Sequence, residues 1–241
     1  MAYTSRSIRR RSDHLAGDIA AVIPQTPHGK RVGVILAQEG DRWLVTLGGY
    51  FGRAAPTELD GFIECARTLP APYIYEVIKD AEPLSESETM RFPASVRRHY
   101  EKLDRFPEGY LVFGDAIASF NPIYGQGMSV AALESEALAI VLTEGTDKLA
   151  RRCFHRAAKI VDMAWTISVG NDLRMPETVG PRNARVNFVN GHMSELYKAA
   201  HIDPVPAIAF FRESNLLVPP PSVLHPRVAW RVLAGNCRIR P

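Results

Sequence analysis

The spacing of hydrophobic and polar positions changes along the chain. The first 60 residues contain short apolar runs typical of strands, at Arg31–Ala37 and Arg42–Leu47. Glu39-Gly40-Asp41 joins these runs and is a hairpin signal, and Gly48-Gly49 predicts a sharp bend or a close backbone approach. From about residue 145 the apolar positions recur at helical spacing. The pattern therefore predicts a β-rich first part and a helical last part.

Further elements follow from caps and breakers. We expect helices over Glu58–Leu69, capped by Thr57, and over Ile74–Lys79, followed by an extended segment from 84 to 100. The apolar run Tyr110–Phe113 predicts a buried strand. The helices expected after it cover residues 128–142, Lys148–Val169, Val186–Ala200, Val205–Leu217 and Pro226–Leu233.

Composition narrows the class of protein. A chain of 241 residues with 46% hydrophobic residues can bury a substantial core, and a net charge of +3 gives no argument for a nucleic-acid partner. The apolar runs are too short to span a membrane. Cys65, Cys153 and Cys237 lie far apart without metal-ligand spacing, which indicates reduced thiols and predicts a cytoplasmic protein without a metal site. We interpret the basic segment Ser5–Arg11 as a strand with a solvated basic face rather than a transit peptide.

The segment from Gly114 to Met128 carries the chemistry. Asp115 follows the expected strand, where a carboxylate needs hydrogen-bond donors such as the hydroxyls of a polyol. Gly125 and Gly127 allow the backbone to approach a flat ligand closely. The helix that begins there directs free N–H groups at the same ligand, so a redox ring that gains negative charge on reduction would be stabilised.

These residues resemble a known motif. Gly114-Asp115-Ala116, Pro122 and Gly125-Gln126-Gly127-Met128, with Ala131 and Ala132 after them, are similar to the second flavin-binding motif of FAD-dependent aromatic hydroxylases. The resemblance implies that Asp115 binds the ribityl chain of FAD, that Pro122–Gly127 lie along the isoalloxazine, and that the helix points at its N1–C2=O edge. The implied cofactor-binding residues are Gly114, Asp115, Pro122, Gly125, Gln126, Gly127 and Met128.

The resemblance also implies a fold. It is a mixed α+β (α/β) flavoprotein hydroxylase fold, present only in part. We expect a β-rich substrate-domain region over 1–105, the flavin-binding strand–loop–helix over 106–145, and a helical C-terminal region over 146–241.

Two departures from the family pattern are visible. Ala118 stands where many members carry a histidine, so no proton-handling role is placed there. No strand followed by G-x-G-x-x-G, which holds the ADP half of FAD, occurs in residues 1–100. Gly125-x-Gly127 does not replace it, because Val130 occupies the third position and a loop of about ten residues separates it from the strand. We therefore expect a C-terminal fragment, whose dinucleotide-binding half another polypeptide could supply.

Other polar and aromatic residues have weaker claims to function. Four basic residues could face an anionic ligand, but a solvated strand face with paired charges explains them more simply: Arg91, Arg97, Arg98 and His99. Four aromatic residues could line a substrate pocket or be plain core, with the last the best candidate: Trp43, Tyr50, Phe51 and Tyr124. Several residues on helical patterns have no evident partner: His155, His192, His201, Asp162 and Asp172.

Three hypotheses of function remain. The first is an FAD-dependent monooxygenase, a hydroxylase or epoxidase, in which NAD(P)H reduces the flavin and O2 supplies an oxygen atom to a hydrophobic or aromatic substrate. The flavin performs the difficult step, so no catalytic acid or base is named. The second is a flavin-dependent reductase; a halogenase is disfavoured because Trp43, Trp165 and Trp230 stand alone, without a W-x-W-x-I-P segment. The third is a non-catalytic remnant or partner subunit.

Overall fold

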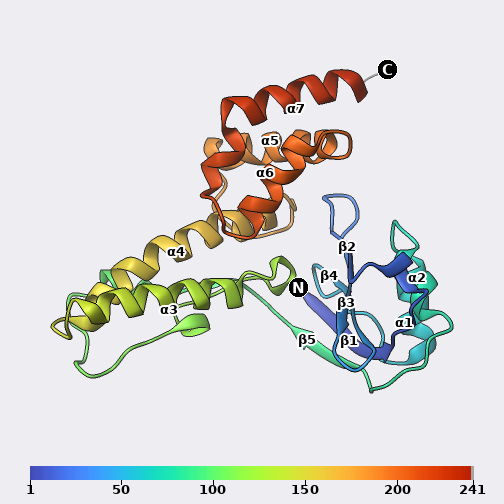
Figure 1. Cartoon of the computed structure of the whole chain (residues 1–241), viewed down its shortest axis with the longest axis horizontal. Coiled ribbons are helices and arrows are strands. Elements are labelled where there is room, and N and C mark those ends of the chain that lie inside the picture. Colours follow the sequence, from blue (N-terminus) through green and yellow to red (C-terminus); the bar gives the residue numbers. More distant parts are fainter. Residues whose placement is uncertain (240–241) are drawn as a thin grey trace. The chain divides into compact units, whose positions relative to one another are not determined.

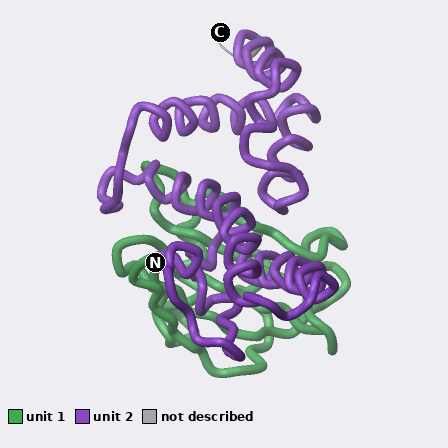
Figure 2. Tube along the Cα trace, turned by 90° about the vertical axis from the view of Figure 1, so that its left-hand side faces the viewer, with its two compact units in different colours: residues 1–94 green, residues 95–241 purple. Residues whose placement is uncertain are grey.

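The chain divides into two compact units, residues 1–94 and residues 95–241 (Figure 2). The computed structural model describes residues 1–239, and each unit is considered by itself below. The division into 1–105, 106–145 and 146–241 expected from the sequence stays a prediction. No helix among residues 1–239 is long and apolar enough to cross a membrane.

The first unit is built on one antiparallel sheet. Its five strands follow the order β2-β3-β4-β1-β5. Their bounds are β1 Ala2–Arg9, β2 Ala20–Ile23, β3 Arg31–Gln38, β4 Arg42–Gly49 and β5 Glu88–Arg91. The predicted hairpin is confirmed: β3 pairs with β4 from Gln38 and Arg42 onward, and Gly40 and Asp41 both have left-handed φ values, at 71° and 49°. Glycine and aspartate tolerate this conformation, which explains the turn.

Two helices cover one face of this sheet (Figure 1). They are α1 Leu59–Arg67 and α2 Tyr73–Ile78, with a 3-10 helix η1 at His14–Gly17. Both predicted helices are confirmed, but Thr57 does not cap the first: the N-cap residue is Glu58, and its side chain makes no capping hydrogen bond. The core between helices and sheet buries Ile35, Trp43, Leu47, Phe62 and Ile74.

β1 alternates between buried and partly exposed residues, as expected for a strand with one covered face. The expected basic face is not wholly solvated. Arg6 is buried, and its guanidinium donates to the hydroxyl of Ser87 and to the carbonyl of Thr57. This side chain therefore ties β1 to the segments before α1 and β5.

The second unit is mostly helical. Its helices are α3 Gly127–Thr143, α4 Leu149–Asp172, α5 Ala184–Ala200, α6 Pro204–Ser214 and α7 Pro226–Ile239. Short elements accompany them: strands β6 Val96–Arg97 and β7 Ala118–Ser119, and 3-10 helices η2 Tyr100–Lys102, η3 Gly114–Ala116, η4 Pro122–Tyr124 and η5 Pro220–Leu224. All five helices predicted after the motif strand are confirmed.

Two hydrophobic cores stabilise the second unit. One forms where α3 packs against α4 and includes Val130, Phe154 and Val161. The other lies among α5, α6, η5 and α7 and includes Leu196 and Val232. Figure 1 shows the same division, with α3 beside α4 and with α5, α6 and α7 grouped together.

The structure has no strand at Tyr110–Phe113, so the prediction of a buried strand there is wrong. The segment has no regular secondary structure, although Phe113 has extended backbone angles of −147° and 151°. Only Val112 is buried; Tyr110 and Phe113 remain 60% and 38% exposed. An extended segment becomes a strand only when a neighbour accepts and donates its backbone hydrogen bonds, and residues 1–239 supply no such ladder here.

Candidate functional site

The residues of the predicted motif come together at the start of α3. η3 presents Gly114 and Asp115, and α3 begins at Gly127 directly beside them. A Cβ atom placed on Gly127 would lie 3.6 Å from Oδ1 of Asp115. The fold thus brings the carboxylate against the helix terminus across twelve positions of sequence.

The loop before α3 turns sharply into the helix. Pro122 opens η4, Gly125 ends it in the left-handed conformation with φ of 64°, and Gln126 is the N-cap residue of α3. No side chain caps α3 among the described residues, so its first N–H groups are available to a ligand. Met128 is 86% exposed, which leaves the first turn open to solvent. The arrangement combines an exposed acid with the positive end of a 17-residue helix.

Gln126 has a structural task as well. Its side chain is buried, and its Nε2 donates to the backbone carbonyl of Ser214 at the end of α6, at 3.2 Å. Its Oε1 has no partner among the described residues. Gln126 therefore connects the start of α3 to the helices that follow in sequence.

Glu134 is a site residue that the sequence analysis missed. It lies on the buried face of α3, and its Oε2 accepts a hydrogen bond from the backbone N–H of Gly114 at 2.8 Å. Burial raises the pKa of Glu134 and the negative charge of Asp115 adds to this, while the Gly114 N–H opposes it. The available signal was an acid on the same helical face as Val130 and Val141. Through Gly114, Glu134 fixes the backbone that carries Asp115.

A small cavity lies below this contact. It measures about 10 Å³ and is lined mainly by apolar side chains of α3, α4 and the segment before η3, with Glu134 at its wall. A space of this size holds about one water molecule and not a flavin ring.

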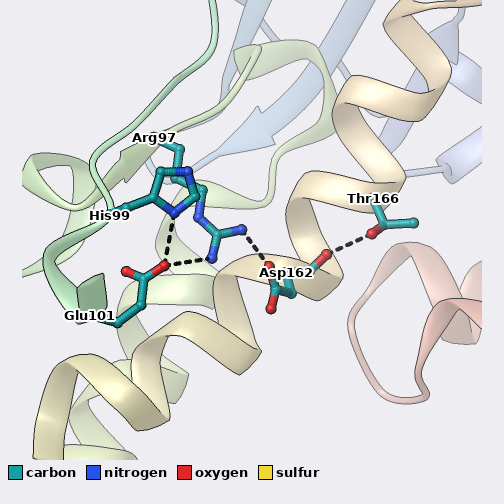
Figure 3. A network of polar contacts seen from close by, with 5 residues as sticks. All are labelled: Arg97, His99, Glu101, Asp162 and Thr166. Atoms are coloured by element: carbon teal, nitrogen blue, oxygen red, sulfur yellow. Dashed lines mark hydrogen bonds and ion pairs between the residues drawn. The ribbon is translucent and has the colours of Figure 1, made fainter. Parts of the chain in front are cut away.

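Arg97 and His99, which precede the motif, belong to a network of polar contacts within the protein (Figure 3). Arg97 of β6 forms ion pairs with Glu101 of η2 and with Asp162 of α4, and only 11% of its side chain is exposed. Nδ1 of His99 contacts the same oxygen of Glu101 at 2.8 Å, and Thr166 donates to the backbone carbonyl of Asp162. The prediction that these charges are paired is confirmed for Arg97. The prediction that the side chain of Arg97 is solvated is wrong, and Asp162, for which the sequence indicated no partner, pairs with it.

The positive and negative charges of this cluster compensate one another. Burial raises the pKa of Glu101, but the hydrogen bond with His99 and the charge of Arg97 outweigh it, so the pKa lies below its ordinary value. Arg97 is held between two carboxylates and is therefore a poor candidate for binding an anionic substrate. We interpret the cluster as a clasp that fixes β6 and η2 on α4.

The aromatic candidates separate clearly. Trp43 is fully buried, and its Nε1–H donates to Nδ1 of His14 at 3.0 Å, so it belongs to the core. Tyr50 is also buried, while Phe51 is 45% exposed. Tyr124 lies in η4, within the loop that resembles the flavin-binding motif, and is partly exposed. Of the four, Tyr124 is the one placed at the motif.

Known proteins resemble this chain in sequence and in structure. No family model matches it. Protein Rv3254 of Mycobacterium tuberculosis is 29% identical over 246 residues, which cover 99% of this chain and 51% of that protein. A flavoprotein/dehydrogenase from Cytophaga hutchinsonii has a similar structure, with a TM-score of 0.61 and 15% identity over 98% of this chain and 55% of that one.

A further similar structure is that of Klebsiella pneumoniae HpxO complexed with FAD and uric acid. It has a TM-score of 0.49 and 14% identity, over 98% of this chain and 53% of that one. The chain shares the fold of the Cytophaga flavoprotein/dehydrogenase. It spans about half the length of the relatives that it matches.

Proposed function

We propose that this chain carries the flavin-ring and ribityl part of the site of an FAD-dependent oxidoreductase of the monooxygenase type. The observation that carries the proposal is the position of Asp115, whose carboxylate lies against the first residue of α3, Gly127. A hydroxyl-bearing chain and an electron-rich ring edge are the two ligand parts that this pair of groups binds best. The shared fold with a flavoprotein/dehydrogenase supports a flavin as the cofactor.

The residues present fit such a group. Asp115 would accept hydrogen bonds from ribityl hydroxyls, and the N–H groups at the start of α3 would face the N1–C2=O edge. Gly125 and Gly127 leave room for the ring, because nothing lies within 4 Å of a Cβ on Gly125 and only Asp115 lies near one on Gly127. When bound, FAD would accept hydride from NAD(P)H and activate O2. The protein's part is to bind, to orient and to favour negative charge at the ring edge.

The ADP half of FAD needs a second binding site. We propose that it is bound by polypeptide beyond these 241 residues, either in the same chain or in a partner. The chain spans about half the length of its relatives, which supports this. The unpaired segment Tyr110–Phe113 supports it too, as does α3, on which Met128, Ile140 and Leu142 are exposed. Apolar surface of this kind is usually covered in a complete protein.

A titration with two flavins tests the ring site. We expect the chain to bind FMN and FAD weakly and with similar dissociation constants, because only ring and ribityl contacts are formed. Asp115→Ala should weaken both about tenfold, the usual scale for a lost hydrogen bond to a charged group. Asp104→Ala removes an equally exposed acid and serves as the control. Tight, stoichiometric binding of FAD would contradict the missing ADP site.

Joining the chain to its missing half tests the reaction. The DNA upstream should encode a strand, a G-x-G-x-x-G turn and a helix, and the longer protein should then hold FAD. If that protein fails to bind FAD, the proposed function is wrong. Oxygen uptake distinguishes the alternatives: a monooxygenase consumes O2 in proportion to a hydroxylated or epoxidised product, whereas a reductase reduces its substrate with NAD(P)H without incorporating oxygen. A non-catalytic subunit would show no turnover in either form.

A further inference from the structure

The end of α4 contacts the loop that precedes α3. Oδ1 of Asp172, the last residue of α4, accepts a hydrogen bond from Nδ2 of Asn121 at 3.0 Å. The same oxygen accepts a second one from the hydroxyl of Tyr124 at 2.9 Å. No partner for Asp172 is evident from the sequence, because these groups are 51 and 48 positions away.

Asp172 occupies a costly position for a carboxylate. The C-terminal end of a helix carries partial negative charge, so an acid there destabilises the helix itself. Two donors on one oxygen are the contacts that offset this cost. The hydrogen bonds to Asn121 and Tyr124 therefore explain the presence of Asp172 better than any contribution to the stability of α4.

The held groups control the shape of the loop. Oδ1 of Asn121 accepts from the backbone N–H of Ile123 and caps η4, so the Asn121 amide is engaged at both ends. Tyr124 is the last residue of η4, and the left-handed Gly125 follows it directly. On the far side of Gly125, Gln126 is attached to the carbonyl of Ser214. The turn into α3 is therefore fixed on both sides by the helical part of the unit.

We infer that Asp172 is a positioning residue of the cofactor site. It acts through Asn121 and Tyr124, which set the course of the loop and with it the direction of the first N–H groups of α3. This inference rests on the proposed flavin site for its consequence, but the contact itself does not. Because Asp172 touches the loop and not Asp115, its removal should loosen the loop while the ribityl contact persists.

Hydrogen–deuterium exchange tests the contact without any flavin. In Asp172→Ala, the backbone amides of residues 123–126 should exchange about tenfold faster, since two hydrogen bonds to a charged group are lost. Asp172→Asn keeps a neutral acceptor and should recover part of the protection. Asn171→Ala is the matched control, because Asn171 lies at the same helix end but bonds to Ile167 and Tyr197 instead. Equal exchange in the wild type and Asp172→Ala would overturn the inference.

Flavin titration of the same variants tests the consequence. We expect the dissociation constant for FMN to rise about tenfold in Asp172→Ala, less in Asp172→Asn, and not at all in Asn171→Ala. Tyr124→Phe should weaken binding too, and combining it with Asp172→Ala should give less than the sum of the single effects, because both variants remove the hydrogen bond between Tyr124 and Asp172. Faster loop exchange, combined with failure of the longer protein to bind FAD, would refute the proposed function alone. Unchanged flavin affinity in Asp172→Ala would refute the positioning role alone.

Discussion

Glu134 and Gly114 are joined by a hydrogen bond of 2.8 Å from the backbone N–H to a carboxylate oxygen, across 20 positions of sequence. The bond attaches η3 to the buried face of α3. Since Asp115 follows Gly114 directly, the same bond sets the distance between the Asp115 carboxylate and the start of α3. An acid inside the helical core therefore supports an acid on its surface.

Replacing Glu134 separates its hydrogen bond from its charge. In Glu134→Ala, the Gly114 N–H loses its acceptor, and we expect the free energy of unfolding to fall by about 1–3 kcal/mol. Glu134→Gln keeps an acceptor without a buried charge and should lose less than half as much. Urea unfolding measures both, with the exposed Glu136→Ala on the same helix as control. A Gln variant as unstable as the Ala variant would contradict the role of the hydrogen bond.

Glu213 should make stability depend on pH. Burial in α6 raises its pKa from 4.5 to about 7. Between these values the folded protein binds more protons than the unfolded one, so stability falls as the pH rises from about 4.5 to about 7 and is then level. The total change is on the order of 3 kcal/mol. Unfolding measured from pH 5 to pH 8 should show this slope in the wild type and a weaker slope in Glu213→Gln; parallel curves would show that Glu213 is not responsible.

Arg97 should contribute more to stability than a surface arginine does. Its removal leaves Glu101 with His99 but without the arginine and opens the clasp between β6 and α4, and we expect a loss of about 1–3 kcal/mol. The neighbouring Arg98 is exposed and makes a single long contact with a backbone carbonyl, so Arg98→Ala should cost less than about 0.5 kcal/mol. A double-mutant cycle between Arg97 and Glu101 measures their coupling, and a coupling of zero would contradict the clasp.

Gly48 should tolerate no side chain. A Cβ there would lie 2.3 Å from the carbonyl oxygen of Ala2 and 2.6 Å from Cα of Tyr3, both in the paired backbone of β1. Because neither atom can move without breaking the ladder, Gly48→Ala should cost about 1–3 kcal/mol or more. Gly170 lies within α4 with open space around it, so Gly170→Ala should stabilise the protein by about 0.5–1 kcal/mol. Thermal unfolding of the two variants should move in opposite directions.

Local features of the fold were accessible from the sequence. The hairpin of β3 and β4 followed from two apolar runs and a turn at Gly40 and Asp41, which depend only on neighbouring residues. The helices followed from apolar spacing. The close approach at Gly48 followed from the paired glycines. In the candidate site, Gly125 and Gly127 indicated the turn into α3 for the same reason.

Contacts between distant segments were not accessible. The apolar run Tyr110–Phe113 has the composition of a strand, but a strand also needs a neighbour, which composition does not supply. Arg97 looked like a solvated charge until α4 placed Asp162 beside it. Both errors concern pairing between segments that are far apart in sequence: Arg97 has such a partner, and Tyr110–Phe113 has none among residues 1–239.

The sequence by itself determined the hairpin and the helices, because periodicity and turns act over a few residues. Only the tertiary structure decided that Glu134 holds Gly114 and that Asp172 holds Asn121 and Tyr124. Such pairs exist only once η3 has packed on α3 and the loop before α3 has packed on the end of α4, since each carboxylate finds its donor through the packing of these segments and not through its neighbours in the chain.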